Sequence, residues 1–360
     1  MAKQTTGAKR IIFTGGGTAG HVTPNIALME PLLREGWEVH YIGSENGIEK
    51  ELIANIATVT YHGISTGKLR RYFSWQNFID PFRVIKGYFQ ARRLIRQIQP
   101  DVIFSKGGFV SVPVVLGAGK APVVAHESDY SPGLSNRIAA RFTDKVCLSF
   151  EDTLAHVAPG KGIFTGTPIR PALYSGSREK ALAFTGFSGE KPVLLVMGGS
   201  LGAQKLNELV RAALPMLCER YEVIHLCGKG KHDCSCAACG YNQYEYIHDE
   251  LPDLFALSDI VLSRAGANSV FELLALNKPS VLVPLTSASS RGDQLLNANY
   301  FEKKGYAKVL DQNTATPELL VQAIDDVYQQ REQYAERMRE DTRSDGTQAI
   351  LEIIKKAANS

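Results

Sequence analysis

The chain twice repeats a pattern in which a short apolar run ends in a cluster of glycines and continues into an amphipathic stretch. In the first copy, Ile11–Thr14 precedes Gly15–His21, and a helical pattern follows from Asn25 to Glu35. In the second copy, Val193–Met197 precedes Gly198–Ala203. A buried strand that turns tightly into a helix begins a doubly wound α/β unit. The sequence therefore predicts two such units in tandem, with a cleft between them.

Further short β-branched runs support parallel sheets in both halves, because helical patterns separate several of them. The predicted strands after the first are Val39–Ile42, Val102–Ser105, Val123–His126 and Val146–Ser149 in the first half, and Val223–Leu226, Tyr244–Ile247, Ile260–Ser263 and Ser280–Pro284 in the second. The turn-rich segment Gly166–Pro171 suits a linker between the halves.

Composition narrows the class of protein. Hydrophobic residues make up 44% of the 360 residues and charged residues 21%, which is typical of a globular chain. The net charge of +3 is too small to indicate nucleic acid as a partner. Met1–Arg10 lacks the apolar region of a signal peptide, and prolines and glycines interrupt Val110–Val124, the most apolar stretch. We therefore expect a protein of the cytoplasm or of its membrane surface, with its six cysteines as free thiols.

The two glycine turns are candidate phosphate-binding sites. Gly15, Gly17 and Gly20 fit the G-x-G-x-x-G spacing between a strand and a helix, where backbone N–H groups hold an anion. Either turn alone could be a close connection without a ligand. A dinucleotide-dependent oxidoreductase is the rival from another class, but it needs an acidic residue at the end of the second strand, and Glu45 comes late.

Six segments together resemble the MurG family of bacterial N-acetylglucosaminyltransferases, in order and over nearly the whole chain. They are Gly16–His21, Ser105–Pro113, His126–Asp129, Gly198–Ala203, Ser263–Ser269 and Arg291–Gln294. The His-Glu-Ser-Asp segment and the run that ends at Gln294 are similar to the Gram-positive form of the family.

The resemblance implies a GT-B fold, with two Rossmann-like domains facing across a cleft. Residues 8–168, completed by a C-terminal helix at 345–360, are expected to face the acceptor and the membrane, and residues 169–344 to bind UDP-GlcNAc. The implied reaction transfers GlcNAc to the MurNAc 4-hydroxyl of lipid I, with inversion, and gives lipid II. The implied partners are an anionic cytoplasmic membrane surface, where the protein would be peripheral, and proteins of cell-wall synthesis and division.

The resemblance also implies roles for individual residues. Ser200 is expected to contact the diphosphate, Arg170 the nucleotide, the Ile247 backbone the uracil, Glu272 the ribose and Gln294 the GlcNAc hydroxyls. Thr18, Ala19 and Gly20 are expected to approach the sugar-diphosphate, with Ala267 and Asn268 at the mouth of the nucleotide site. Asp129 is a further substrate-binding candidate, although many members have asparagine there. From the residues alone, a dipole partner for its helix is the preferred interpretation of Glu272.

The reaction needs a base and charge stabilisation, and no metal or other cofactor is expected. His21 is the first candidate for the base, because the start of a helix favours neutral imidazole, and Glu127 is the second. A histidine that only shapes the turn is the alternative. No Asp-x-Asp motif for Mg²⁺ stands at a suitable strand end, and helix N-termini can stabilise the leaving diphosphate instead.

Lys68–Arg96 is basic and rich in aromatic residues. On a helix, one stripe consists of Val84, Tyr88, Ala91, Ile95 and Ile98 and is expected to face the core, and a second consists of Phe78, Phe82, Ile85 and Phe89. The segment could equally bind nucleic acid or form a wide buried face, but a lipid-linked acceptor favours docking to an anionic membrane.

Alternatives remain for the cysteine cluster, for the acceptor and for the class of protein. Cys234, Cys236 and Cys239 with His232 are cramped for a zinc site, and we do not expect one. A GT-B transferase with another lipid acceptor, such as diacylglycerol, and a UDP-GlcNAc epimerase would share the fold. An oxidoreductase would explain the first glycine turn but not the second half.

Overall fold

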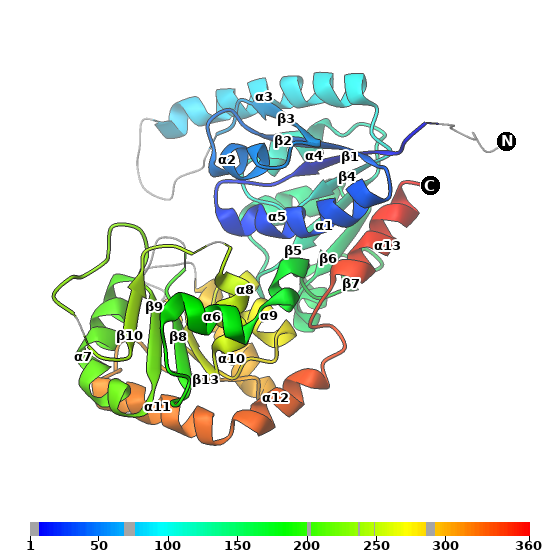
Figure 1. Cartoon of the computed structure of the whole chain (residues 1–360). Coiled ribbons are helices and arrows are strands. Elements are labelled where there is room, and N and C mark those ends of the chain that lie inside the picture. The colour runs from blue at the N-terminus through cyan, green and yellow to red at the C-terminus, as the bar shows by residue number, and fades with distance from the viewer. Residues whose placement is uncertain (1–6, 68–75, 200–202, 237, 248, 286–291) are drawn as a thin grey trace. The chain divides into compact units, whose positions relative to one another are not determined.

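The computed structural model describes residues 7–67, 76–199, 203–236, 238–247, 249–285 and 292–360. The chain divides into two compact units. Unit 1 comprises Met1–Arg170 with Asp345–Ser360, and unit 2 comprises Pro171–Ser344. Each unit is built on a parallel sheet with helices on its faces (Figure 1).

Unit 1 contains a seven-stranded sheet in the order β3-β2-β1-β4-β5-β6-β7. Its strands are β1 Arg10–Thr14, β2 Glu38–Ser44, β3 Val59–Ile64, β4 Val102–Ser105, β5 Val123–Glu127, β6 Lys145–Leu148 and β7 Gly162–Phe164. Its helices are α1 Thr23–Arg34, α2 Ile48–Ala54, α3 Gln76–Ile98, α4 Ser111–Gly117, α5 Leu134–Ala139 and α13 Thr347–Ala357. The order reverses between β1 and β4, which is where doubly wound sheets place their ligands.

Unit 2 repeats this order with six strands, β10-β9-β8-β11-β12-β13. The strands are β8 Val193–Met197, β9 Glu222–Leu226, β10 Tyr241–Tyr244, β11 Ile260–Ser263, β12 Ser280–Leu282 and β13 Ala307–Val309. The helices are α6 Arg178–Thr185, α7 Gln204–Arg220, α8 Leu251–Leu257, α9 Ala267–Ala275, α10 Asp293–Lys304, α11 Pro317–Gln329 and α12 Arg331–Arg339. The reversal here lies between β8 and β11.

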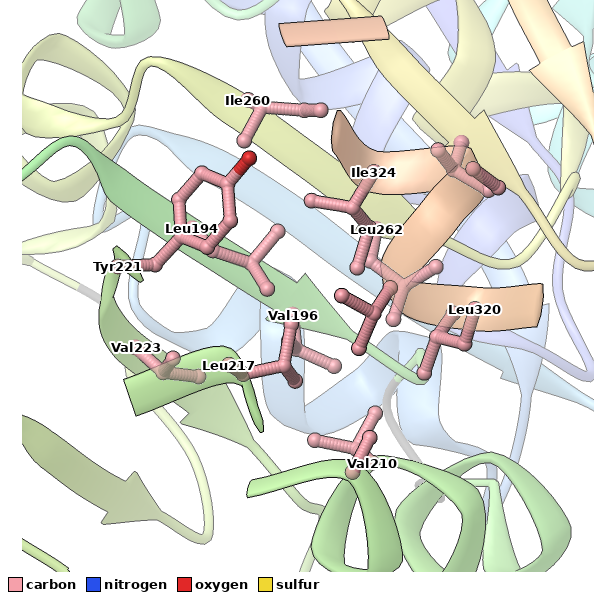
Figure 2. Packing of buried hydrophobic residues seen from close by; sticks show 14 of the residues in the cluster. Leu194, Val196, Val210, Leu217, Tyr221, Val223, Ile260, Leu262, Leu320 and Ile324 are labelled. Carbon is pink, nitrogen blue, oxygen red and sulfur yellow. The ribbon is translucent and has the colours of Figure 1, made fainter. Parts of the chain in front are cut away.

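Buried aliphatic side chains hold each sheet to its helices. In unit 2, Leu194 and Leu262 from the sheet meet Val210 of α7 and Ile324 of α11 (Figure 2). In unit 1, α13 returns to the sheet, beside α1 and against β4 and β5. Its apolar face, Ile350, Leu351 and Ile354, is at most 2% exposed and shares a core with Phe13 and Phe104.

The predicted strand Tyr244–Ile247 is wrong, because the strand is three residues earlier, at Tyr241–Tyr244. Tyr241 sets this position: its ring packs into the unit 2 core and its hydroxyl is 2.9 Å from His225 Nδ1. Ile247 lies beyond the strand, in a loop. The edge strand β3 and the three-residue strands β7 and β13 were not predicted.

Candidate functional site

The glycine turn after β1 is held against unit 1 by a buried carboxylate. Glu49, the second residue of α2, is fully buried and accepts hydrogen bonds from the N–H groups of Ser44 (2.9 Å) and Gly17 (3.2 Å). A Cβ at Gly16 would lie 2.6 Å from the Glu49 carboxyl carbon, so only glycine allows this approach. Because the Gly17 N–H already has an anionic partner, it is not a donor for a phosphate.

Two further side chains fix the start of the turn. The Tyr41 hydroxyl donates to the Gly15 carbonyl at 2.7 Å, and Asn25 Nδ2 donates to the Tyr41 hydroxyl at 3.2 Å. Burial and the nearby Glu49 carboxylate raise the pKa of Tyr41, so this tyrosine stays a donor. The turn is therefore a rigid support for the residues that follow it.

His21 ends the short 3₁₀ turn Ala19–His21, directly before α1. Its Nδ1 lies 2.9 Å from the Thr18 hydroxyl. His21 and Ala19 are half-buried, whereas Thr18 and Gly20 are exposed. A histidine whose Nδ1–H donates to a hydroxyl carries its lone pair on Nε2, so this contact can set the tautomer that a base requires.

A second glycine turn, after β4, packs on the first. Gly108 has a φ of +81°, and a Cβ there would lie 2.4 Å from the Gly16 carbonyl oxygen and 3.4 Å from His21 Nδ1. The two turns lie next to the reversal in strand order of unit 1. His21 is thus placed where a ligand of this sheet is expected.

Glu127 closes β5 and organises the loop that follows. Its carboxylate is 4% exposed and accepts hydrogen bonds from the Asp129 N–H (3.0 Å), the Gly133 N–H (3.0 Å) and Asn136 Nδ2 (2.8 Å). Burial, together with the charge of Asp129, raises the pKa of Glu127. A carboxylate with donors on both oxygens is well suited to holding a loop.

His126 belongs to the interior of unit 1. Its Nε2 lies 3.1 Å from the Gly166 carbonyl oxygen and 3.3 Å from the Ser149 hydroxyl. Burial and the nearby Lys106 ammonium hold the pKa of His126 well below its usual range, so this histidine is neutral. Asp129 is half-buried in the loop after Glu127.

A cavity of about 240 Å³ adjoins Glu127 within unit 1. Its lining includes Asn136, Arg137, Arg141 and His156. The two arginines are exposed and give its mouth a positive character.

The corresponding end of the unit 2 sheet holds a cavity of about 260 Å³. It is lined by Gly198, Ala203, Gln204, Lys205, Arg264, Leu285, Gln294 and Gln312. Arg264, 6% exposed, donates to the Val283 carbonyl at 2.8 Å and to Gln312 Oε1 at 2.5 Å, and burial lowers its pKa to about 10. The side-chain carbonyl of Gln294 accepts a hydrogen bond from the Leu285 N–H at 3.0 Å. This bond fixes the orientation of the Gln294 side-chain amide.

The other residues predicted for the nucleotide lie around the same sheet end or at the end of unit 1. Ala267 and Asn268 begin α9, and Glu272 is its sixth residue, in the second turn. Ile247 is 9% exposed, and Arg170 is the last residue of the first segment of unit 1. Ser200 lies outside the described residues.

The comparisons with known proteins agree over both units. The family model described as the glycosyltransferase family 28 N-terminal domain matches residues 11–148, and the C-terminal domain model matches residues 193–354. A UDP-N-acetylglucosamine–N-acetylmuramyl-(pentapeptide) pyrophosphoryl-undecaprenol N-acetylglucosamine transferase of Geobacillus thermodenitrificans is 53% identical over 97% of this chain and 99% of its own length. A protein of the same description from Lachnoclostridium phytofermentans is also 53% identical, over 96% and 98%.

This chain belongs to glycosyltransferase family 28. Among solved structures, MurG of Acinetobacter baumannii has a TM-score of 0.76 at 26% identity, over 97% of this chain and 99% of that one. A UDP-GlcNAc 2-epimerase of Neisseria meningitidis has a TM-score of 0.65 at 13% identity, over 97% and 99%, and shows a shared fold alone. The predicted α/β fold of two Rossmann-like domains is confirmed. Because the chain belongs to family 28, the alternative of a dinucleotide-dependent oxidoreductase is wrong.

Helix α3 of unit 1 has one buried face and one exposed apolar face. Ala91, Ile95 and Ile98 of the first predicted stripe are buried, whereas Phe82, Ile85 and Phe89 of the second are 73%, 54% and 64% exposed. The side chain of Phe78 and all of residues 68–75 of this predicted surface fall outside what the structure describes. None of the helices in the described ranges is both long and apolar enough to span a membrane.

In the cysteine-rich loop, cysteine side chains contact neighbouring polar side chains of the same loop. Cys234 Sγ lies 3.6 Å from His232 Nδ1, and Cys236 Sγ lies 3.6 Å from Asp233 Oδ2. Ala237 of this loop is outside the described residues, and among those described no group of three or more potential ligands has the geometry of a metal site.

Proposed function

We propose that this chain transfers GlcNAc from UDP-GlcNAc to the MurNAc 4-hydroxyl of lipid I and so forms lipid II. The observation that carries this is the match of both units to family 28, with relatives that are 53% identical over nearly their full length and described as this transferase. A different lipid acceptor is the alternative that the same fold would allow.

The donor is assigned to unit 2. Its cavity contains Gln294 for the GlcNAc hydroxyls and Gly198 at the turn before α7. Glu272 is assigned to the ribose hydroxyls, the Ile247 backbone to the uracil, and Ala267 and Asn268 to the mouth of the site. Ser200 is assigned to the diphosphate and Arg170 to the nucleotide. The start of a long helix such as α7 can stabilise the charge that grows on the leaving UDP.

The acceptor is assigned to unit 1. Thr18, Ala19 and Gly20 of this unit are assigned to the sugar-diphosphate, and Asp129 is assigned to a sugar. The arginines at the cavity beside Glu127 suit the anionic diphosphate of a lipid-linked substrate. Glu127 itself serves to hold the loop, since both of its oxygens already accept hydrogen bonds.

His21 is assigned as the base. With Nδ1–H donating to Thr18, His21 Nε2 takes the proton of the acceptor 4-hydroxyl while that oxygen bonds to C1 of GlcNAc. The bond from C1 to the UDP oxygen breaks, the configuration at C1 inverts, and UDP leaves.

The test is an assay with UDP-GlcNAc and a lipid I analogue that detects both the disaccharide product and free UDP. We expect His21→Ala to lower turnover by about 100-fold or more while UDP affinity stays within about twofold. Thr18→Val, which removes the hydroxyl beside Nδ1, should lower turnover by a smaller factor. Near-normal turnover in His21→Ala would remove His21 from the mechanism, and diacylglycerol in place of lipid I as the better acceptor would overturn the proposed substrate.

The surface of α3 is assigned to an anionic membrane, where the lipid-linked acceptor resides. Exposed Phe82, Ile85 and Phe89 provide apolar area, and exposed Arg83, Lys86 and Arg93 provide positive charge on the same helix. The protein would then be peripheral on the cytoplasmic face, where cell-wall synthesis and division proteins are candidate partners. Phe82→Ser with Phe89→Ser should weaken sedimentation with phosphatidylglycerol vesicles, and unchanged sedimentation would refute this assignment.

A further inference from the structure

Lys106, the residue directly after β4, is a lysine inside the protein. It is 1% exposed, and its Nζ donates to the Ser128 hydroxyl at 2.7 Å. Burying an ammonium group is unfavourable unless its surroundings compensate. A lysine in this position therefore indicates a role that a neutral side chain would not fulfil.

The compensating charges come from the segment after β5. The carboxylates of Glu127 and Asp129 both favour the charged form of Lys106. His126, which also faces Lys106, is neutral because burial and the ammonium lower its pKa. The ammonium thus offsets the repulsion between two carboxylates that stand two residues apart.

Lys106 also adjoins the glycine turn that carries His21. A Cβ at Gly15 would lie 3.1 Å from Lys106 Cβ and 3.2 Å from Asn25 Nδ2. On the other side, a Cβ at Gly107 would lie 2.2 Å from Asn136 Oδ1, and Asn136 bonds Glu127. The main chain around Lys106 is therefore packed between the His21 turn and Asn136 of α5, whose side chain holds Glu127.

We propose that Lys106 is a positioning residue for acceptor recognition, whose ammonium holds Ser128 and thereby fixes Asp129 relative to the His21 turn. This inference rests on the proposed function, since unit 1 is assigned to the acceptor. Lys106 does not touch the substrate; it acts through Ser128 and through the charge balance with Glu127 and Asp129.

The role depends on the proton of the ammonium group. Burial lowers the pKa of Lys106 to about 8, against the attraction of Glu127 and Asp129. Above that pH the neutral amine still reaches Ser128 but no longer offsets the two carboxylates. We expect kcat/KM for the acceptor to fall as the pH rises through about 8.

The variant that tests this is Lys106→Met, which keeps the length of the side chain and removes the charge. We expect kcat/KM for a lipid I analogue to fall about 10- to 100-fold, as for loss of a hydrogen bond from a charged group, mainly through KM. UDP affinity should stay within about twofold, and the decline of kcat/KM above pH 8 should disappear.

Two companion variants make the result specific. Ser128→Ala keeps the ammonium and should show a smaller loss with the alkaline decline retained. Lys145→Met removes an exposed ammonium of the same unit, which donates to the Gly160 carbonyl at 2.8 Å, and should behave as wild type.

The assay distinguishes failure of the Lys106 role from failure of the proposed transferase activity. A wild-type protein that forms no product would overturn both. If the wild type is active and Lys106→Met retains its kcat/KM, its UDP affinity and its alkaline decline, Lys106 has no positioning role. An equal loss of affinity for UDP and for the acceptor would likewise overturn the assignment to the acceptor.

Discussion

Lys106→Met should stabilise unit 1 at neutral pH even though it impairs turnover. Burial lowers the pKa of Lys106 from 10.5 to about 8, so the unfolded chain binds the proton more tightly than the folded protein does. A group with a depressed pKa in the folded state gives the wild type less stability at low pH and progressively more as the pH rises from about 8 toward 10.5. Methionine has no proton to bind and lacks this pH dependence.

The size of the effect follows from the two pKa values. Their difference corresponds to about 3 kcal/mol at pH 7 and to about 1.4 kcal/mol at pH 9.5. Loss of the hydrogen bond to Ser128 reduces the advantage of methionine by about 1–2 kcal/mol at both pH values. The difference in unfolding free energy between Lys106→Met and wild type should therefore decrease by about 2 kcal/mol from pH 7 to pH 9.5.

Urea unfolding followed by tryptophan fluorescence measures this difference for unit 1. The two tryptophans of the chain, Trp37 and Trp75, both belong to that unit. Ser128→Ala is the control, because it keeps the titrating amine and should follow the pH dependence of the wild type. A difference between Lys106→Met and wild type that is the same at both pH values would refute the reasoning.

Two further predictions concern the supports of the site. Gly108→Ala should destabilise unit 1 by about 2–4 kcal/mol, because of left-handed backbone strain and contact with the Gly16 carbonyl. Gly36→Ala, also at a φ of +81° but with nothing within 4 Å of its Cβ, should destabilise it by about 1 kcal/mol. Equal losses in urea unfolding would contradict a close packing of the two turns. Glu127→Gln should lose about 2–3 kcal/mol of stability, because an amide N–H₂ replaces an oxygen that accepts from Gly133 or Asp129; an unchanged unfolding midpoint would show that this carboxylate does not hold the loop.

The elements that the sequence predicted well are those buried on both faces. Val102–Ser105 and Ile260–Ser263 are strands at these bounds, because a central parallel strand needs a continuous apolar run. Edge strands lack that signal: β3 is only partly buried, and its alternation with exposed positions is weak. For β10 the sequence pattern favoured Tyr244–Ile247, whereas the strand lies where the Tyr241 hydroxyl reaches His225 Nδ1, sixteen residues away in the sequence.

For the candidate site, glycine turns and helix starts were visible in the sequence, and their supports were not. Glu272 could be placed near the start of a helix from the residues alone, and it lies in the second turn of α9. The sequence analysis assigned no role to Glu49 or Lys106, and burial of a glutamate or a lysine is rare enough that nothing local predicts it. Both side chains are buried by contacts with the turn after β1, which is distant from them in the sequence. No local sequence pattern reveals such contacts.

The return of α13 to the sheet of unit 1 bears on how the protein is made. Ile350, Leu351 and Ile354 complete a core that otherwise comes from the first 170 residues. The ribosome must therefore synthesise all of Pro171–Ser344 before the earlier unit can close. At 5–20 residues per second that interval is on the order of 10–30 s. During it the nascent sheet leaves part of its apolar face uncovered, whereas unit 2, contiguous in sequence, can fold as soon as it emerges.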